Sequence, residues 1–216
     1  MHVLRRGNPS RDGVLVCEKR WKGACVLLRQ MQEEHAQAQE ESNQRPLDSS
    51  VEDGVAMAMG QSLVLIKPDG VQRGIVGRIL TRFEDAGLKM VGMKMAWIDS
   101  SFSRKHYDAH VDKPFYKGLE NYIVEGPVLA IVFEGLHCVE IIRKIVGPTE
   151  PRKALPGTIR GDFAHHSYEY TDKAGKSIKN LIHASGTIAE AKKEIALWFT
   201  DSELHSYATV HEKHVF

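Results

Sequence analysis

Hydrophobic positions along the chain become periodic only from Ser62 onward. The segment SLVLIK is a short apolar run followed by the turn residues PDG, and this pattern predicts a buried strand. Four apolar residues then recur at helical spacing: Val71, Ile75, Ile79 and Phe83. The spacing predicts one helix, and Gly87 is placed to end it.

The next segment, MVGMKMAWI, alternates between apolar and small or polar residues. One face carries four large side chains: Val91, Met93, Met95 and Trp97. This alternation predicts a half-buried strand. Serines 100, 101 and 103 can cap a following helix that runs through Tyr107, and a second short helix is expected after Pro114.

Three more elements follow a second apolar strand pattern, PVLAIVFE. The helix expected after that strand is lined on one face by Val139, Ile142, Ile145 and Val146. A loop rich in Pro and Gly covers residues 147–157, and a final strand reaches Ile182. Thr187 and Glu190 form a capping box that starts a last helix, which is expected to end near Phe199.

The order of these elements is typical of the α/β (α+β) class. Its kernel matches the split β-α-β arrangement of the ferredoxin-like fold, a four-stranded antiparallel sheet with helices packed on one face. Many chemistries share this fold, so the fold alone assigns no function.

Composition narrows the class of protein without naming an activity. Hydrophobic residues make up 42% and charged residues 26% of the 216 positions, values typical of a soluble globular protein. The formal net charge of +1 gives no global attraction to nucleic acid or a membrane, and no apolar run approaches the roughly 18 residues of a membrane span. The three cysteines form no C-x-x-C pair, which favours a cytoplasmic location.

The first 60 residues differ in character from the rest of the chain. Residues 1–31 hold seven Lys/Arg and two Asp/Glu, whereas residues 32–53 hold one base and seven acids in a low-complexity tract. Such a tract cannot bury a core, so we expect 1–60 to be a largely disordered or dispensable extension and 61–216 to be the working domain. An Arg-rich transit peptide is an alternative, as is a start of the working protein at Met57 or Met59.

Two motifs fail on inspection. KAGKSI contains Gly175-Lys176-Ser177, but a P-loop needs glycine where Tyr170 stands. His106 and His110 have a spacing that can ligate zinc, yet no third metal ligand lies at a sequence spacing typical of a zinc site. A solvated or packed histidine pair is therefore favoured.

Several weaker signals agree with one another. Lys67 ends a strand in KPDG, and Phe115 follows Pro114 in DKPFYKGL. Two arginines and a hydroxyl surround the 147–157 loop, a combination suited to polyphosphate because guanidinium binds oxyanions bidentately: Arg143, Thr149 and Arg160. His183, in NLIHASGT, lies between a strand and the mouth of a helix, where unpaired N–H groups favour an anion.

Taken together, the motifs KPDG, HY, KPF, PGTIRGD and NLIH follow one another in the order found in nucleoside diphosphate kinases. Residues 61–216 resemble that family from end to end. The resemblance implies transfer of the γ-phosphoryl group of a nucleoside triphosphate to a nucleoside diphosphate through a phosphohistidine, in a ping-pong cycle that maintains the nucleotide pools.

The resemblance also implies a role for each matching residue. His183 matches the nucleophile, Glu194 the carboxylate that orients its ring, and Ser185 a supporting hydroxyl. Lys67 matches the residue that neutralises the transferring phosphoryl group, Asn180 and Lys67 match contacts to the sugar, and Tyr107 matches the aromatic beside them. The remaining matches concern the nucleotide, with a phosphate clamp and a ring on which the base stacks: Arg143, Thr149, Arg160 and Phe115.

Cofactor and assembly are expectations from the same resemblance. Mg²⁺ is expected to be held through the nucleotide phosphates, with no dedicated carboxylate cage in the sequence. The family assembles as hexamers or tetramers, and residues 147–157 form a subunit contact in the hexamers. The sequence leaves the choice between a hexameric and a tetrameric homo-oligomer open.

Three departures from the family pattern stand out. Ala184-Ser185-Gly186 follows the histidine where Gly-Ser-Asp is common. An insertion at about 164–179 lies just before Asn180, with Ser177 where an apolar residue is common, and we expect a hairpin with DKAG at its tip. Residues 1–60 have no counterpart in the family.

The alternative function is a non-catalytic nucleotide-binding or nucleic-acid-binding module on the same fold, although the strands lack the aromatics that bind RNA in such modules.

Overall fold

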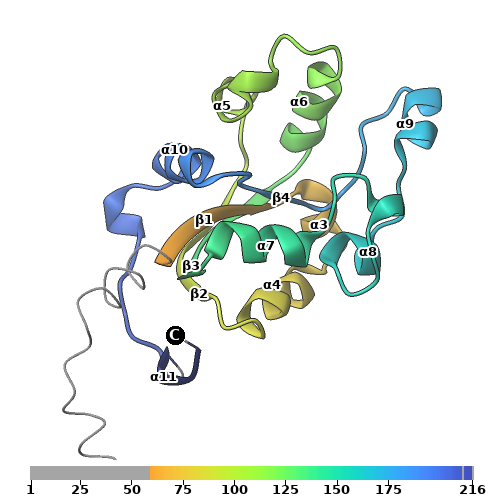
Figure 1. The fold of residues 1–216 in the computed structure, drawn as a ribbon. Helices are drawn as coiled ribbons and strands as arrows, with labels where there is room; N and C mark the ends of the chain where they lie inside the picture. The colour runs from red at the N-terminus through yellow and green to blue at the C-terminus, as the bar shows by residue number, and fades with distance from the viewer. Residues whose placement is uncertain (1–58, 211, 216) are drawn as a thin grey trace, which may run out of the picture. The chain divides into compact units, whose positions relative to one another are not determined.

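The computed structural model describes residues 59–210 and 212–215, and the predictions made for residues 1–58 lie outside this range. At its centre is a four-stranded sheet with the strand order β2-β3-β1-β4, in which every neighbouring pair is antiparallel (Figure 1). The strands are β1 (Met59–Ile66), β2 (Lys89–Ala96), β3 (Val128–Leu136) and β4 (Ile182–Ala184). The predicted fold class is confirmed, although β1 begins at Met59, before the expected domain boundary.

Helices cover both faces of the sheet, so the expectation of a single covered face is wrong. One face packs against α4 (Val76–Glu84) and α7 (Cys138–Val146). The other packs against α5 (Ser100–His106), α6 (Tyr116–Val124) and α10 (Ile188–Trp198). The physical reason lies in β1, where residues 63–66 are all fully buried, because a strand covered on both faces is apolar throughout rather than alternating.

The predicted helix over residues 71–83 is divided into two. A short helix, α3 (Pro68–Gln72), ends before Gly74, and α4 starts only at Val76. Gly74 has a φ of 66°, in the left-handed region that glycine adopts without steric cost, so the chain turns there. The turn directs α4 across the sheet while α3 stays at the end of β1.

Strand β2 differs from the predicted half-buried strand in which of its side chains are buried. A β-bulge between Met90 and Gly92 shifts the alternation, so that Val91 is 3% exposed whereas Met93, Met95 and Trp97 are 52%, 59% and 71% exposed. Because β2 is an edge strand, these side chains are largely uncovered within the described part of one chain, although the Trp97 indole donates to the Val124 carbonyl at the end of α6.

Helix caps mostly follow the sequence, with one exception. Asp99 rather than a serine caps α5, since its side chain accepts a hydrogen bond from Phe102 N. Helix α6 follows Pro114 as expected, and Thr187 caps α10, which ends at Trp198. The remaining short helices are η1 (Asp108–His110), η2 (Pro151–Lys153), α8 (Ile159–Phe163), η3 (Asp201–Glu203) and α11 (Glu212–Val215).

The insertion forms a helix, not the expected hairpin. Helix α9 (Tyr168–Ala174) is capped by the Ser167 hydroxyl, which accepts from Tyr170 N at 3.2 Å, and it ends at Gly175. A residue that caps a helix start and a glycine that ends it enclose a segment with adequate helix propensity, so a local helix forms in place of a turn.

In the described part of the chain, no helix has the length and apolar character needed to cross a membrane.

Candidate active site

A cleft of about 940 Å³ opens between β4, α7, α6 and the insertion. Eight of the ten residues singled out in the sequence line it: Lys67, Tyr107, Phe115, Arg143, Thr149, Arg160, Asn180 and His183. The other two, Ser185 and Glu194, lie behind His183 and contact it directly or through one another. Antiparallel pairing of β4 with β1 places His183 opposite Leu65, so the ring projects from a strand whose partner is fully buried.

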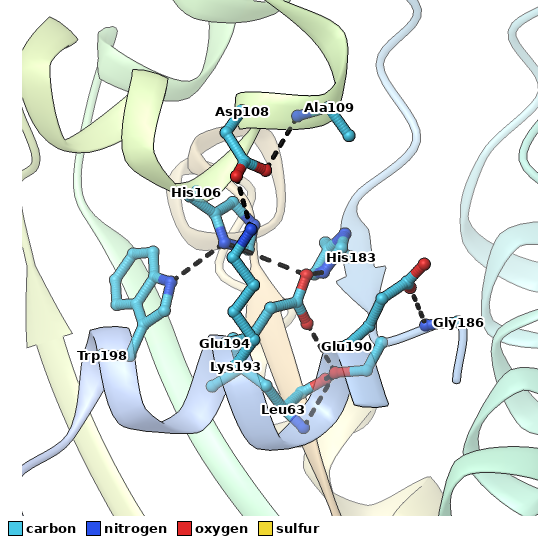
Figure 2. A network of polar contacts seen from close by, with 11 residues as sticks. Leu63, His106, Asp108, Ala109, His183, Gly186, Glu190, Lys193, Glu194 and Trp198 are labelled. Atoms are coloured by element: carbon cyan, nitrogen blue, oxygen red, sulfur yellow. Dashed lines mark hydrogen bonds and ion pairs between the residues drawn. The ribbon is translucent and has the colours of Figure 1, made fainter. Parts of the chain in front are cut away.

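The His183 ring is oriented by a carboxylate from α10. Its Nε2 lies 2.9 Å from Glu194 Oε1, and this contact is one of those drawn in Figure 2. A carboxylate oxygen only accepts, so Nε2 carries the hydrogen and Nδ1 carries the lone pair of the neutral ring. Nδ1 is therefore the nitrogen that can act as a nucleophile.

The second oxygen of Glu194 is held by the serine that follows the histidine. The Ser185 hydroxyl donates to Glu194 Oε2 at 2.5 Å, and Leu63 N donates to the same hydroxyl at 3.3 Å, which ties the pair to β1. Burial opposes the charged form of Glu194, but the hydrogen bonds from His183 and Ser185 outweigh it and hold the pKa of this carboxyl below its usual value. Glu194 is thus an anion fixed behind the histidine.

Lys67 and Asn180 meet at the floor of the cleft. The Lys67 ammonium donates to Asn180 Oδ1 at 2.8 Å, and Asn180 Nδ2 donates to the Thr149 carbonyl at 3.0 Å. Burial and the nearby Arg160 charge lower the pKa of Lys67 to about 7. The lysine is therefore poised to gain charge when an anion enters the cleft.

A backbone kink next to β4 sets these positions, and sequence reasoning missed it. Leu181 is fully buried with a φ of 70°, a left-handed conformation that is rare and strained for a branched side chain. Its N–H donates to Asp69 Oδ2 at 3.2 Å, and its carbonyl accepts from Lys67 N at 2.8 Å. Tyr122 donates to the other Asp69 oxygen at 2.6 Å. Asp69 in the KPDG motif was the sequence signal that could have indicated this kink, but only Lys67 was selected from that motif.

The two predicted clamp arginines differ in their surroundings. Arg160 is 8% exposed and donates to three backbone carbonyls, those of Asn180 (3.2 Å), Gly147 (2.8 Å) and Ile182 (2.6 Å). Burial and the charge of Arg143 lower its pKa to about 10, so it stays protonated at neutral pH. Arg143 lies on the exposed side of α7 and lines the same cleft. Together with Lys67 they make this end of the cleft electropositive.

The opposite end of the cleft is formed by α6 and the insertion. Phe115, at the start of α6, is 56% exposed, and Gly118 one turn on lies so close to the insertion that a Cβ there would be 2.6 Å from Ser177 Oγ. Lys179 pairs with Glu125 and lies 4.3 Å from the centre of the Tyr122 ring. The insertion is thereby fastened along α6 and supplies the wall that faces Phe115.

Two aromatic neighbours of His183 come from the HY pair. Tyr107 is 6% exposed, its ring lies edge-on to His183 at 6.1 Å between centres, and its hydroxyl has no hydrogen-bond partner among the described residues. Burial raises the pKa of this hydroxyl, so it is a neutral donor. His106 contacts His183 rather than pairing with His110 as a zinc site, and Trp198 donates to it.

The donor set fits a metal only through a bound nucleotide. Within residues 59–210 and 212–215, one group of three metal-type ligands is close enough for an ion: His106, His183 and Glu194. Within this group His183 Nε2 already donates to Glu194, and His106 Nδ1 already accepts from Trp198, so a divalent ion held between the three side chains would have to displace these contacts. The cationic end of the cleft instead suits phosphates, which can carry Mg²⁺ with them.

Comparison with known proteins decides the family. The family model for nucleoside diphosphate kinase matches residues 60–204. The nucleoside diphosphate kinase of Pyrococcus horikoshii is 50% identical over 147 residues, covering 68% of this chain and 89% of the relative. The chain belongs to the nucleoside diphosphate kinase family.

Solved structures of nucleoside diphosphate kinases share the fold. One is a transition-state mimic of the enzyme from Borrelia burgdorferi with bound vanadate and ADP, at 44% identity and a TM-score of 0.71, covering 73% of this chain and 97% of that one. Another is a halophilic nucleoside diphosphate kinase from Halobacterium salinarum in complex with CDP, at 42% identity and a TM-score of 0.65, covering 72% and 97%. The matched span includes the insertion and the whole cleft of this kinase family member.

Proposed function

We propose that this protein is a nucleoside diphosphate kinase that carries the phosphoryl group on His183 Nδ1. The observation that carries the proposal is the hydrogen bond from His183 Nε2 to Glu194, which leaves the Nδ1 lone pair available beside Lys67, Arg143 and Arg160. Imidazole suits the task because it is nucleophilic near neutral pH and releases phosphate again.

The reaction follows from this arrangement in two half-cycles. The Nδ1 lone pair attacks the γ-phosphorus of a nucleoside triphosphate, the bond from phosphorus to the β–γ bridging oxygen breaks, and the diphosphate leaves with that electron pair. The Nε2 hydrogen stays shared with Glu194, whose negative charge stabilises the phosphorylated ring. A second diphosphate then attacks the same phosphorus through its terminal β-oxygen and restores His183.

Charge on the phosphates is neutralised by fixed cations of the chain. Lys67, Arg143 and Arg160 act on the phosphate oxygens, with the Thr149 hydroxyl as a further donor. Mg²⁺ bound to the nucleotide would enter with the phosphates and neutralise charge on the β- and γ-groups. Tyr107 supplies a neutral hydroxyl next to the reacting ring.

The nucleoside occupies the other half of the cleft. Asn180 and Lys67 contact the sugar hydroxyls, and the base stacks on Phe115 with the insertion facing it. Stacking uses the face that every base has, so we infer activity on nucleotides of several bases.

The test is incubation with γ-labelled ATP in the absence of an acceptor. We expect a label on the protein that is lost in acid, is retained in alkali, and moves to an added nucleoside diphosphate. His183→Ala should abolish both label and transfer, whereas the control His165→Ala, which changes an exposed histidine, should retain them. An alanine variant at 183 that still turned over would overturn the assignment.

A non-catalytic nucleotide-binding module is the second candidate. It would bind ADP with the same cleft but take no label, so the same experiment separates the two. The intact set of Lys67, His183 and Glu194 in hydrogen-bonding geometry favours the enzyme.

We also infer a homo-oligomer. Met93, Met95 and Trp97 form an exposed apolar strip on the edge strand β2, which a second copy can bury. Sedimentation should give a hexamer or a tetramer, and a monomer at micromolar concentration would contradict the inference.

Finally, we propose that residues 1–56 are not needed for transfer and that the protein acts in the cytoplasm. A chain beginning at Met57 keeps all of β1 and should fold, assemble and transfer phosphate like the full chain. Loss of turnover on this truncation would show that phosphate transfer requires the N-terminal segment.

A further inference from the structure

A second histidine is buried against the nucleophile. His106, at the end of α5, has a fully buried side chain, and its ring lies edge-on to His183 with 4.8 Å between centres. Its Nδ1 lies 4.0 Å from Glu194 Oε1, the oxygen that accepts from His183. Figure 2 shows His106 and His183 on either side of this carboxylate. Two imidazoles thus share one carboxylate oxygen as a neighbour.

The hydrogen on His106 is placed by a tryptophan. Trp198 Nε1 lies 3.2 Å from His106 Nδ1, and indole N–H is only a donor. Nδ1 must therefore accept, so the neutral ring carries its hydrogen on Nε2. That Nε2 atom is buried and has no hydrogen-bond partner among the described residues.

The position of this hydrogen matters for Glu194. With a lone pair on Nδ1, His106 cannot donate to Oε1, and His183 is the ring that donates there. If Nδ1 of His106 carried a hydrogen, a small movement would let it donate to the same oxygen. His183 would then be free to place its own hydrogen on Nδ1, where it would block attack on phosphorus.

We propose that Trp198 and His106 are positioning residues that hold His183 in its nucleophilic tautomer. The Trp198 indole keeps His106 from donating to Glu194, and Glu194 in turn keeps the His183 hydrogen on Nε2. The inference rests on the proposed phosphohistidine function, because it concerns which nitrogen of His183 is free to react.

The charge state of His106 agrees with this arrangement. Burial, with the neighbouring His183, lowers its pKa to about 3, so it is neutral at physiological pH. The other charged groups that face it are Glu194 from α10, Lys67 at the end of β1 and Asp108 beside it in η1. The indole donor is not a cause of this lowering, so its loss would change which nitrogen of the neutral His106 ring carries the hydrogen and not the charge of the ring.

The experiment compares Trp198→Phe with Tyr170→Phe, which changes an exposed aromatic side chain outside the cleft lining. Phosphorylation by ATP in a single turnover should slow at least about tenfold in Trp198→Phe, with ADP affinity unchanged. The control should match the parent. A second substitution, His106→Phe, removes the competing donor and should restore much of the rate to Trp198→Phe, which simple loss of packing would not do.

Nitrogen-15 spectra of the histidine rings give a readout that does not depend on turnover. We expect the Nε2–H form of both His106 and His183 in the parent protein and a mixture in Trp198→Phe. An Nδ1–H form of His106 in the parent, or a Trp198→Phe rate equal to that of the parent at every pH, would overturn the inference. If the parent takes no label, the proposed function fails, and the spectra then decide the tautomer arrangement by themselves.

Discussion

The two ends of the cleft are built differently. At the reacting end, Lys67, Asn180 and Ser185 are at most 6% exposed, and each is hydrogen-bonded to backbone or to another site residue. At the base end, Phe115 and Tyr168 are 56% and 43% exposed and lie on short helices outside the sheet. The end at which we propose the reaction is anchored in the core, and the end at which we propose that the base stacks is not.

The reacting end can be buried only if its charged groups are hydrogen-bonded. Buried charges are tolerated only where their hydrogen bonds are satisfied, and the carbonyls on either side of Leu181, those of Asn180 and Ile182, both accept from the Arg160 guanidinium. Substitutions at the reacting end should therefore disturb fold and chemistry together, while those at the base end should change affinity alone.

The largest effect is expected for Arg160→Ala. It leaves two buried carbonyls and one part-buried carbonyl without this donor, so the free energy of unfolding should fall by at least about 3 kcal/mol, and transfer should be lost. Chemical denaturation and the coupled transfer assay measure the two effects. Arg143→Ala is the matched control: it should weaken nucleotide binding but leave stability within about 0.5 kcal/mol. Equal losses of stability in Arg160→Ala and Arg143→Ala would contradict the expected difference between the buried and the exposed arginine.

Glu194→Gln should act on the chemical step. The amide lacks the charge that stabilises a phosphorylated ring and can donate as well as accept, so phosphorylation should slow by about 10- to 100-fold while ADP affinity stays near normal. Glu190→Gln, on the same helix, should change the rate by less than about twofold. Weaker ADP binding with an unchanged single-turnover rate would show that Glu194 does not act on His183.

The pH dependence of binding should report Lys67. Its pKa of about 7 in the free protein means that the ammonium is half deprotonated at pH 7 and almost fully deprotonated at pH 9, whereas bound phosphate favours the charged form. ADP affinity should therefore fall as pH rises over this range, by up to about a hundredfold, with uptake of a proton on binding. Titration calorimetry in two buffers of different ionisation heat measures the uptake. Lys67→Met should lose this dependence, and a pH-independent affinity in the parent would contradict the prediction.

The smallest effect is expected at the base end, for Gly118→Val. The new side chain meets Ser177 and pushes the insertion away from Phe115, so ADP affinity should fall about threefold while the single-turnover rate is unchanged at saturation. Adding Ser177→Gly should restore the affinity. A change in the chemical rate instead would mean that the two ends of the cleft are coupled.

Local sequence signals predicted much of the architecture. Apolar runs predicted β1 and β3, the capping pair of Thr187 and Glu190 predicted α10, and the residues singled out for the site lie in or directly behind one cleft. The roles of those residues in transfer stay predictions. The match of separated motifs predicted the family, which the comparisons confirm.

Tertiary structure decided what no local pattern encodes. The bulge in β2 and the covering of both sheet faces each depend on pairing or packing with distant segments. The hydrogen bond between Trp198 and His106 joins residues 92 positions apart. The sequence by itself determined which chemical groups the protein has and the elements that carry them, because propensity, capping and apolar periodicity act over a few residues. Which nitrogen of His183 is free to react is a property of contacts that exist only once α5, β4 and α10 have met.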